Sequence, residues 1–267
     1  MRKVNIIKNR NDYSMEVAGN LKKILEAKGF QVPEEYAQDA ELIVTIGGDG
    51  RLLKAIQEYN FPSIPIVGVN TGHLGFFQEV DPDEMESFVD NYINGEYQVQ
   101  ELSTVKATIK TSMDEFEHVG LNEIVIRGAH LNHTTHLDIS IGESFMEKFS
   151  GDGVLISTPA GSTAYNYSLH GSIVDPRIHA LQVTPISPMN TNAYRSFISS
   201  MLVPQDLPII VTPRNYKDKR RLCITNDSSE AYYDDVEEIR IELTDKPIKL
   251  LRFEGYDFWD KVMSKFL

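Results

Sequence analysis

An apolar strand pattern runs directly into a glycine-rich turn early in the chain. Residues 42–46 are mostly apolar and β-branched, as in a buried strand, and Gly47-Gly-Asp-Gly50 follows at once. Glycines let backbone amides approach a ligand closely, and the amides that open a helix attract anions. Residues 51–59 have the pattern of that helix. A strand, a glycine turn and a helix in this order predict an open, mostly parallel α/β sheet whose turn can hold phosphate groups.

The turn also contains a carboxylate. Asp49 would repel phosphate oxygens, so its position suggests that it binds Mg²⁺ or accepts a proton from a hydroxyl nucleophile. The alternative is an ordinary connection in which Asp49 caps the helix at 51–59, because Asp and Gly are common at such positions. The turn alone leaves both interpretations open.

Composition restricts the class of protein and of partner. The 267 residues include 41% hydrophobic and 24% charged residues, which is typical of a globular chain that divides into two domains. A formal charge of −13 argues against nucleic acid or an anionic membrane as a partner, but allows a small anionic ligand held by local groups. Cys223 is the only cysteine, so no intrachain disulfide can form. Without a signal-peptide or membrane-spanning pattern, we expect a cytoplasmic protein.

Up to residue 100 the chain alternates short apolar strands with helical patterns. The predicted strands lie at 4–7, 42–46 and 64–69, with a helix between the first two. Another helix follows Asp81, which can cap it, with Pro82 in the first turn and Glu84 completing a capping box. Ligands of such α/β units bind at the carboxyl ends of the strands, where the Gly47–Gly50 turn is expected.

From about Ser103 the pattern changes to short alternating runs separated by polar turns, which indicates a β-rich, sandwich-like domain. The runs lie at 105–110, 121–126, 136–141, 154–157, 207–211, 222–225, 239–243 and 248–253, and an amphipathic segment ends the chain at 258–263. The Asp- and Tyr-rich stretch at 231–235 is interpreted as a solvated turn. No flexible linker separates the two parts, so we expect a site in the cleft between them.

A second glycine-rich segment, Gly151-Asp-Gly153, precedes another turn at 157–165. Its proline and glycine predict the turn, and its Ser and Thr hydroxyls suit a ribose or a phosphate. Tyr165 adds a flat ring on which a base can stack, and Asp152 can accept a hydrogen bond from an amine or carboxamide. Taken alone, such a segment is more often simply a turn.

Five motifs occur in one order along the chain. They are Gly47-Gly-Asp-Gly50, Asn70-Thr-Gly-His-Leu-Gly-Phe76, Leu121-Asn-Glu123, Gly151-Asp-Gly153 and the 157–165 turn. This set resembles the NAD kinases over nearly the whole chain. The first motif alone would not identify the family, because diacylglycerol kinases and phosphofructokinases carry similar turns.

The resemblance implies transfer of the γ-phosphoryl group of ATP, or of polyphosphate in some members, to the adenosine 2′-hydroxyl of NAD, giving NADP. Mg²⁺ or another divalent cation would take part, and the family usually forms homodimers or homotetramers. The implied domains are an α/β domain at 1–100, a β-rich NAD-binding domain at 101–237, and a segment at 238–267 that returns to the first.

The resemblance also implies roles for individual residues. Asp49 would be the proton acceptor, and Gly47, Gly48 and Arg51 would contact phosphate. The implied substrate-binding residues are Gly50, Leu53, Phe76, Asn122, Glu123, Ser150, Asp152, Ala160, Thr163, Ala164, Tyr165, Asn166, Ser168 and Ser187. Among these, Asn122 and Glu123 would bind ribose and base, Asp152 and Tyr165 the ends of the dinucleotide, and Phe76 would wall the pocket.

Four positions depart from the family pattern. Arg51 follows Gly50 where Thr is common, and Ala160 stands where Thr or Ser is frequent. His170-Gly171 replaces a Gly-Gly pair, and Asp227-Ser228 replaces Asp-Gly. The proposed catalytic carboxylate is retained, so these departures concern donor preference and affinity.

Three histidines form a separate constellation. The spacing of His130, His133 and His136 could bind Zn²⁺ on a helix. They instead connect two predicted strands, where this spacing does not place all three on one face, so we interpret them as a polar hairpin loop and predict no protein metal site.

Two other functions stay open on the sequence. A phosphotransferase for a lipid or sugar phosphate would share the first turn but leave the 157–165 turn unexplained. A noncatalytic dinucleotide-binding sensor would keep the binding motifs without needing Asp49.

Overall fold

The structure is a computed structural model that describes residues 2–73, 75–130, 133–191, 195–214, 221–227 and 229–266. The chain divides into two compact units. The first unit comprises Met1–Leu102 and Pro247–Leu267, and the second comprises Ser103–Lys246. The expected C-terminal segment began at 238, whereas the unit boundary follows Lys246. The reason is that the strand across this position pairs with two strands of the second unit.

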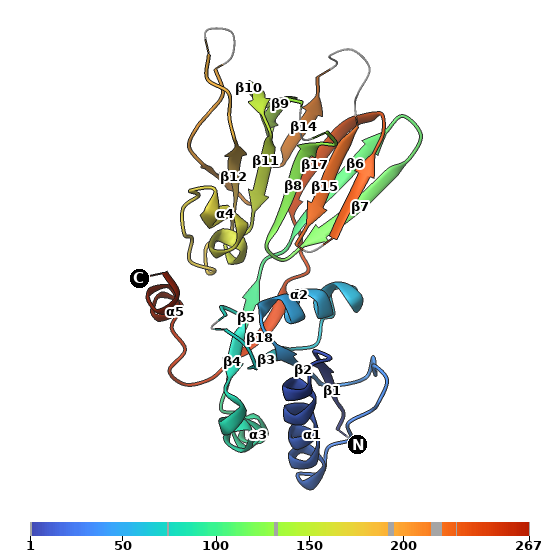
Figure 1. Cartoon of the computed structure of the whole chain (residues 1–267), viewed down its shortest axis with the longest axis vertical. Helices are drawn as coiled ribbons and strands as arrows, with labels where there is room; N and C mark the ends of the chain where they lie inside the picture. Colours follow the sequence, from blue (N-terminus) through green and yellow to red (C-terminus); the bar gives the residue numbers. More distant parts are fainter. Residues whose placement is uncertain are drawn as a thin grey trace. The chain divides into compact units, whose positions relative to one another are not determined.

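The first unit contains a mostly parallel six-stranded sheet (Figure 1). Its strands are β1 (Val4–Lys8), β2 (Leu42–Gly47), β3 (Ile66–Asn70), β18 (Ile248–Arg252) and β5 (Gln98–Leu102) in spatial order, with β4 (Gln78–Val80) beside β3. Only β5 runs antiparallel to its neighbour. The parallel pairing of β18 with β3 brings the end of the chain into this sheet.

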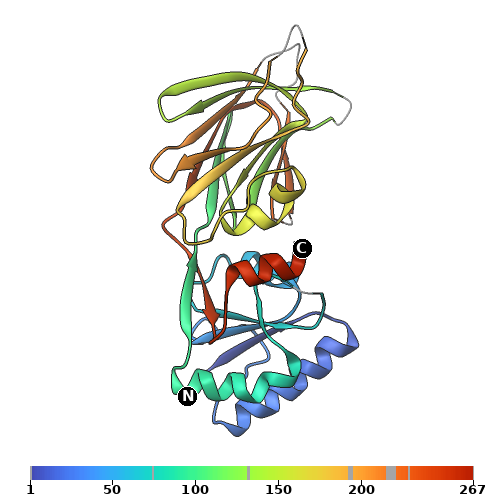
Figure 2. The ribbon, with the colours of Figure 1, turned by 90° about the vertical axis from the view of Figure 1, so that its left-hand side faces the viewer.

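Helices cover both faces of this sheet (Figure 2). α1 (Asp12–Ala27) and α3 (Met85–Asn94), preceded by the 3₁₀ turn η1 (Pro82–Glu84), lie on one face, and α2 (Asp49–Glu58) and α5 (Phe258–Phe266) lie on the other. Since both faces are covered, all six residues of β2 are buried. The predicted strands and helices of this region are confirmed. The predicted capping box is not, because the Asp81 side chain makes no capping hydrogen bond.

The second unit is a sandwich of two six-stranded antiparallel sheets, as the alternating pattern predicts. One sheet has the order β10-β9-β14-β17-β6-β7 and the other β13-β12-β11-β8-β15-β16. The bounds are β6 (Val105–Thr111), β7 (Glu115–Gly120), β8 (Glu123–Gly128), β9 (Thr135–Ile141), β10 (Ser144–Gly151), β11 (Gly153–Ser157), β12 (Ala180–Ile186), β13 (Met201–Pro204), β14 (Ile209–Pro213), β15 (Leu222–Asn226), β16 (Ser229–Tyr233) and β17 (Val236–Leu243). Apolar residues of both sheets form one core, including Ile109 and Ile239 from the first and Ile126 and Ile156 from the second.

Two predictions for the second unit are wrong. Residues 231–233 do not form a turn, because they belong to β16 and pair with β15. The histidine segment is not a hairpin loop either, since it joins β8 of one sheet to β9 of the other. Within the described parts of the chain, every helix is too short or too polar to cross a bilayer.

Candidate active site

The glycine turn connects β2 to α2 at the carboxyl edge of the first unit's sheet. Gly47, the last residue of β2, is paired with Asn70 at the end of β3, so both strands end at this edge. A Cβ added at Gly47 would lie 2.7 Å from the Cβ of Arg51, so only glycine fits without a shift. Gly48 occupies the N-cap of α2 and has no side chain to cap the helix. The amides that open α2 therefore have no side-chain cap and can face an anion, although the Arg51 amide already donates to the Gly48 carbonyl at 2.9 Å.

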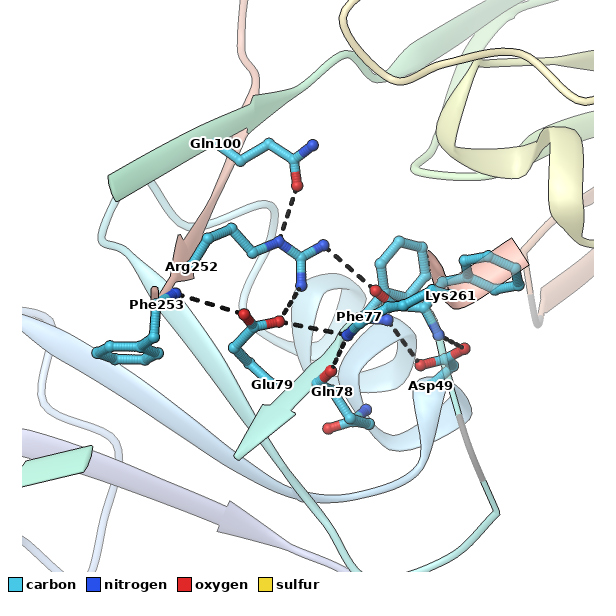
Figure 3. Close-up of polar contacts among 9 residues, drawn as sticks. Asp49, Phe77, Gln78, Glu79, Gln100, Arg252, Phe253 and Lys261 are labelled. Carbon is cyan, nitrogen blue, oxygen red and sulfur yellow. Dashed lines mark hydrogen bonds and ion pairs between the residues drawn. The ribbon is translucent and has the colours of Figure 1, made fainter. Parts of the chain in front are cut away.

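Asp49 is not the helix cap but the first residue of α2, and its carboxylate is fixed by two backbone amides (Figure 3). Oδ2 accepts from the Phe76 amide at 2.9 Å, and Oδ1 accepts from the Phe77 amide at 3.0 Å. Gly75 packs directly against the same carboxylate, since a Cβ added there would lie 2.2 Å from Oδ1. The side chain is still 24% exposed, and the Lys265 ammonium lies 3.9 Å from Oδ2. Each carboxylate oxygen keeps a lone pair for an incoming hydroxyl.

Arg51 contacts its own helix rather than a free anion site. Its guanidinium pairs with Glu58 two turns later in α2, and the side chain is 12% exposed. Gly50 is exposed and Leu53 is half-buried in the same helix. The ion pair favours a structural role for Arg51 over the phosphate contact that the resemblance implies.

We expect Arg51→Thr to leave the KM for ATP within about twofold, because the lost partner is Glu58 and not the donor. Breaking the pair should lower the free energy of unfolding by about 0.5 kcal/mol. Kinetics with ATP varied at saturating NAD measure the first, and Glu58→Gln is the matched control that breaks the same pair. A KM that rises only in Arg51→Thr would assign the guanidinium to the donor phosphates.

Phe76, the expected pocket wall, is covered by the C-terminal helix. Its ring centroid lies 6.0 Å from that of Phe258 and 5.7 Å from that of Phe266, and the Lys265 ammonium lies 4.8 Å above it. The side chain is only 6% exposed. In the first unit this ring therefore anchors α5 to the segment that holds Asp49.

In the second unit, a carboxylate organises the turn that carries Asn122 and Glu123. Asp227 accepts from the amide of Leu121 at 2.8 Å through one oxygen and from the amides of Asn122 at 2.8 Å and Glu123 at 3.3 Å through the other. Asp227 itself has a left-handed φ of 47°. Through these three hydrogen bonds Asp227 holds the turn of the site, although Ser228 replaces the glycine that follows this Asp in the family pattern. Ser228 itself lies outside the described residues.

The turn after β11 packs directly on the Asn122 backbone. The Thr158 amide donates to the Asn122 carbonyl at 2.8 Å, and the Thr158 hydroxyl donates to the Leu121 carbonyl at 2.6 Å. A Cβ added at Gly161 would lie 2.0 Å from the Asn122 carbonyl oxygen. The structure thus brings together two motifs that are separated in the sequence.

Asn122 and Glu123 each bury a side-chain oxygen without a partner. Asn122 Oδ1 and Glu123 Oε2 have no hydrogen bond among the residues that the structure describes. The side chains belong to residues that are 5% and 7% exposed. Burial, assisted by the nearby charge of Asp227, raises the pKa of Glu123 to about 8. Buried oxygens without a protein partner call for a bound water or a ligand to complete their hydrogen bonds.

Asn166, an expected substrate contact, is fully buried and makes hydrogen bonds that hold the turn around it. Its Oδ1 accepts from the Thr184 hydroxyl at 2.6 Å, and its Nδ2 donates to the Ser162 carbonyl at 3.3 Å. Gly171 lies so close that a Cβ there would be 2.2 Å from Asn166 Oδ1. His170 has a left-handed φ of 61°, the conformation that glycine provides where the Gly-Gly pair occurs.

Thr163, Ala164 and Ser168 make local hydrogen bonds within η2 (Ala160–Thr163) and α4 (Tyr165–Ser168). The Thr163 hydroxyl donates to the Ala160 carbonyl at 3.4 Å, and the Ala164 amide donates to the Gly161 carbonyl at 2.9 Å. The Ser168 hydroxyl donates to the Tyr165 carbonyl at 2.8 Å. These bonds leave the Tyr165 ring 39% exposed.

Asp152, Tyr165 and Ser187 line one cavity of about 250 Å³ within the second unit. The cavity also contains residues that the sequence did not assign to a site: Arg127, His130, His133, Thr135, Leu169 and Ile186 among them. Arg127 Nε is buried without a hydrogen-bond partner among the described residues. Arg127 occupies an ordinary alternating strand, so no local signal marks it.

Ser150 and His136 are paired across β10 and β9, next to Phe149 and Leu137, which point into the core of the sandwich; His136 is half-buried. The Ser150 hydroxyl lies 2.8 Å from His136 Nδ1, and its amide donates to the Ser196 hydroxyl at 2.9 Å. Ser150 is fully buried, and its expected contact with the substrate stays a prediction. His130 and His133 lie with ring centroids 5.8 Å apart. Over the described ranges, no three His, Cys, Asp or Glu side chains form a metal-binding group.

Two family models match the chain over most of its length. The ATP-NAD kinase N-terminal domain matches residues 5–97, and the ATP-NAD kinase C-terminal domain matches residues 121–253. The chain is 36% identical to the NAD kinase of Finegoldia magna over 267 residues, covering 99% of this chain and 97% of that protein. It is 34% identical to NAD kinase 1 of Listeria innocua over 238 residues, covering 87% and 88%.

Solved structures share the fold. A yeast NADH kinase complexed with NADH superposes with a TM-score of 0.86 at 22% identity, covering 100% of this chain and 87% of that one. An NAD kinase from Archaeoglobus fulgidus in complex with ATP gives a TM-score of 0.78 at 20% identity, covering 99% and 98%.

Proposed function

The chain belongs to the NAD kinase family, and from this premise we propose that it transfers the γ-phosphoryl group of ATP to the adenosine 2′-hydroxyl of NAD, giving NADP. The observation that carries the proposal is the Asp49 carboxylate, which two amides fix at the opening of α2. The related structures that contain NADH and ATP support the substrate classes.

The glycine turn of the first unit supplies two kinds of group to this reaction. Asp49 accepts the proton of the attacking hydroxyl, while the backbone amides of the Gly47–Gly50 turn hold the donor phosphates. Little covalent chemistry is needed, because phosphoryl transfer depends mainly on alignment and on neutralising charge. Arg51 is not needed for this arrangement, since its charge is paired with Glu58.

The second unit supplies the dinucleotide-binding groups. Asn122 Oδ1 and Glu123 Oε2 accept hydrogen bonds from ribose hydroxyls or from the base, and these bonds supply the partners that both buried oxygens lack within the protein. Asp152 accepts from an amine or carboxamide, and the exposed Tyr165 ring stacks on a base in the same cavity. Asn166 and Ser150 shape this region from inside.

The divalent cation belongs to the donor in this proposal. Mg²⁺ prefers oxygen ligands and usually combines phosphates and water with one or two carboxylates. Asp49 is such a carboxylate at the turn, and the described residues contain no larger set of acidic or histidine ligands. The cation therefore enters as the Mg²⁺ complex of ATP. Polyphosphate would carry it in the same way.

The decisive experiment is to incubate the purified protein with Mg²⁺, ATP and NAD and to measure NADP. We expect NADP to accumulate with one ADP per NADP. Binding of NAD without turnover would indicate a dinucleotide sensor, and turnover of a lipid or sugar phosphate without NADP would indicate another phosphotransferase. We place the activity in the cytoplasm and propose that the enzyme is a homo-oligomer. Measuring the size of the purified enzyme in solution tests the oligomeric state.

Tyr165→Ala is expected to weaken NAD binding by about 1–3 kcal/mol, because the ring loses a stacked base. Calorimetric titration with NAD measures this directly. Tyr167→Ala is the matched control, since Tyr167 lies on the same short helix and is 40% exposed. Equal NAD affinities in the two variants would remove Tyr165 from the binding site.

NAD binding near pH 7 is expected to release up to about one proton from Glu123. Its raised pKa keeps the free carboxyl protonated at this pH. Ribose donors favour the ionised form, so the pKa falls on binding and the proton leaves; above a pH of about 8 the release fades. Calorimetry in two buffers of different ionisation enthalpy counts these protons. Glu123→Gln should bind NAD without release, and a release that persists would place the titrating group elsewhere.

A further inference from the structure

Arg252 is a buried arginine at the end of β18 whose guanidinium makes three different polar contacts (Figure 3). Nη1 lies 2.9 Å from Glu79 Oε2, and Nε donates to Gln100 Oε1 at 2.8 Å. The third contact goes to backbone: Nη2 donates to the Phe76 carbonyl at 3.2 Å. The residue is 4% exposed, and its guanidinium carbon lies 3.9 Å from the centre of the Tyr256 ring. The side chain therefore has a single, well-defined position.

The backbone contact connects Arg252 to the catalytic carboxylate through one residue. Phe76 gives its carbonyl to Arg252, while its amide donates to Asp49 Oδ2 at 2.9 Å. The next amide, that of Phe77, donates to Asp49 Oδ1 at 3.0 Å. The Phe76 carbonyl and the Phe77 amide belong to the same peptide plane, so movement of that carbonyl would tilt the amide that donates to Asp49 Oδ1. The orientation of the carboxylate thus depends on a contact made by a strand near the end of the chain.

A second cation completes the network. Glu79 Oε2 is shared between Arg252 and the Lys261 ammonium at 3.3 Å, and Lys261 also donates to the Gln78 carbonyl. Burial lowers the pKa of Lys261, and the charge of Glu79 opposes this. Arg252 and Lys261 together balance the charges of Glu79 and Asp49. Buried charges of this kind are weak evidence for stability, because packed apolar residues serve as well or better. Their geometry therefore calls for another explanation.

We propose that Arg252 is a positioning residue for phosphoryl transfer: it holds the Phe76–Phe77 peptide so that the Phe77 amide, beside that of Phe76, keeps the Asp49 carboxylate aimed at the acceptor hydroxyl. The proposal rests on the catalytic role of Asp49 proposed above. Arg252 touches neither substrate in this scheme. Its loss should lower the rate of the chemical step without weakening the binding of NAD or ATP.

The test is a double-mutant cycle in kcat between Arg252→Lys and Asp49→Asn. Lysine keeps the positive charge but cannot reach Glu79, Gln100 and the Phe76 carbonyl together. We expect Arg252→Lys to lower kcat about tenfold with both KM values within about twofold. In the Asp49→Asn background the same replacement should change kcat by less than about twofold, because there is no longer a carboxylate to orient.

Arg2→Lys is the matched control in the same unit. Arg2 also pairs with a glutamate, Glu41, and lies over an aromatic ring, that of Phe30 at 4.6 Å. Its partners Glu41, Phe30 and Tyr92 all lie outside the Asp49 segment, so its replacement should leave kcat unchanged. If Arg252→Lys does not fold, as judged by circular dichroism, Gln100→Leu removes one support of the guanidinium. It should lower kcat about threefold, again only with Asp49 present.

The outcomes separate this inference from the proposed function. Equal losses from Arg252→Lys in both backgrounds, or an unchanged kcat, would overturn the positioning role, and so would a rise in KM alone. Full turnover in Asp49→Asn would instead remove the catalytic role of Asp49, and with it the basis of the inference. A loss of kcat in Arg252→Lys that disappears in the Asp49→Asn background supports both the positioning role of Arg252 and the catalytic role of Asp49.

Discussion

Asp49→Asn is expected to lower kcat by about 10²-fold or more while NAD affinity stays within about twofold. Asparagine has nearly the same shape and can still accept one amide hydrogen bond, so the turn should keep its structure. It cannot accept the proton of the attacking hydroxyl. Its amide group would also face the Phe76 or Phe77 amide, which turns one of two good hydrogen bonds into a repulsive contact. The loss therefore falls on the transition state.

Steady-state kinetics with both substrates, together with calorimetric NAD titration, check this expectation. Asp12→Asn is the matched control, because Asp12 is likewise an acidic residue in the first turn of a helix of the first unit. Its kcat should equal that of the unmodified protein. Wild-type turnover in Asp49→Asn at saturating substrates would remove Asp49 as the proton acceptor and leave it only the task of fixing the turn.

The sequence predicted strands best where burial is continuous or strictly alternating. β2 is apolar and buried along its length, and β6 alternates inward and outward residues. Strands at sheet edges were missed, because one face meets solvent and their composition is polar. β7 and β16 are such cases, and both end a sheet. β12 was missed for another reason: it is fully buried, yet Gln182 and Thr184 interrupt its apolar pattern.

The candidate site could be proposed from the sequence where its functional groups lie in one short, contiguous motif. The Gly47–Gly50 turn and the Leu121–Glu123 segment are such local patterns, and their roles in the site stay predictions. The groups that orient them are distant in the sequence. Asp227 organises the turn at Asn122, and Arg252 reaches Phe76, without any spacing that would reveal either contact. Asn166 illustrates a second difficulty. Its place in a motif does not tell whether its side chain contacts a ligand or only makes buried hydrogen bonds that support the turn.

Gly161→Ala is expected to weaken NAD binding by about 10²-fold and to lower the free energy of unfolding by about 2–3 kcal/mol. The added methyl group would lie 2.0 Å from the Asn122 carbonyl oxygen and 2.5 Å from its carbonyl carbon. These are backbone atoms, so no side-chain rotation relieves the overlap. The turn must move away from Asn122. The Thr158 amide would then lose its 2.8 Å bond to the same carbonyl.

Gly19→Ala provides the control for the loss of a glycine. A Cβ at Gly19 meets nothing within 4 Å, and the residue lies inside α1, so alanine should stabilise the protein by about 0.5–1 kcal/mol without changing NAD affinity. Thermal unfolding and NAD titration of both variants test the pair. The contact at Asn122 positions the unpartnered oxygens of Asn122 and Glu123, so a displaced turn should weaken NAD binding as well as folding. Unchanged NAD affinity in Gly161→Ala would show that these oxygens are positioned by Asp227 alone.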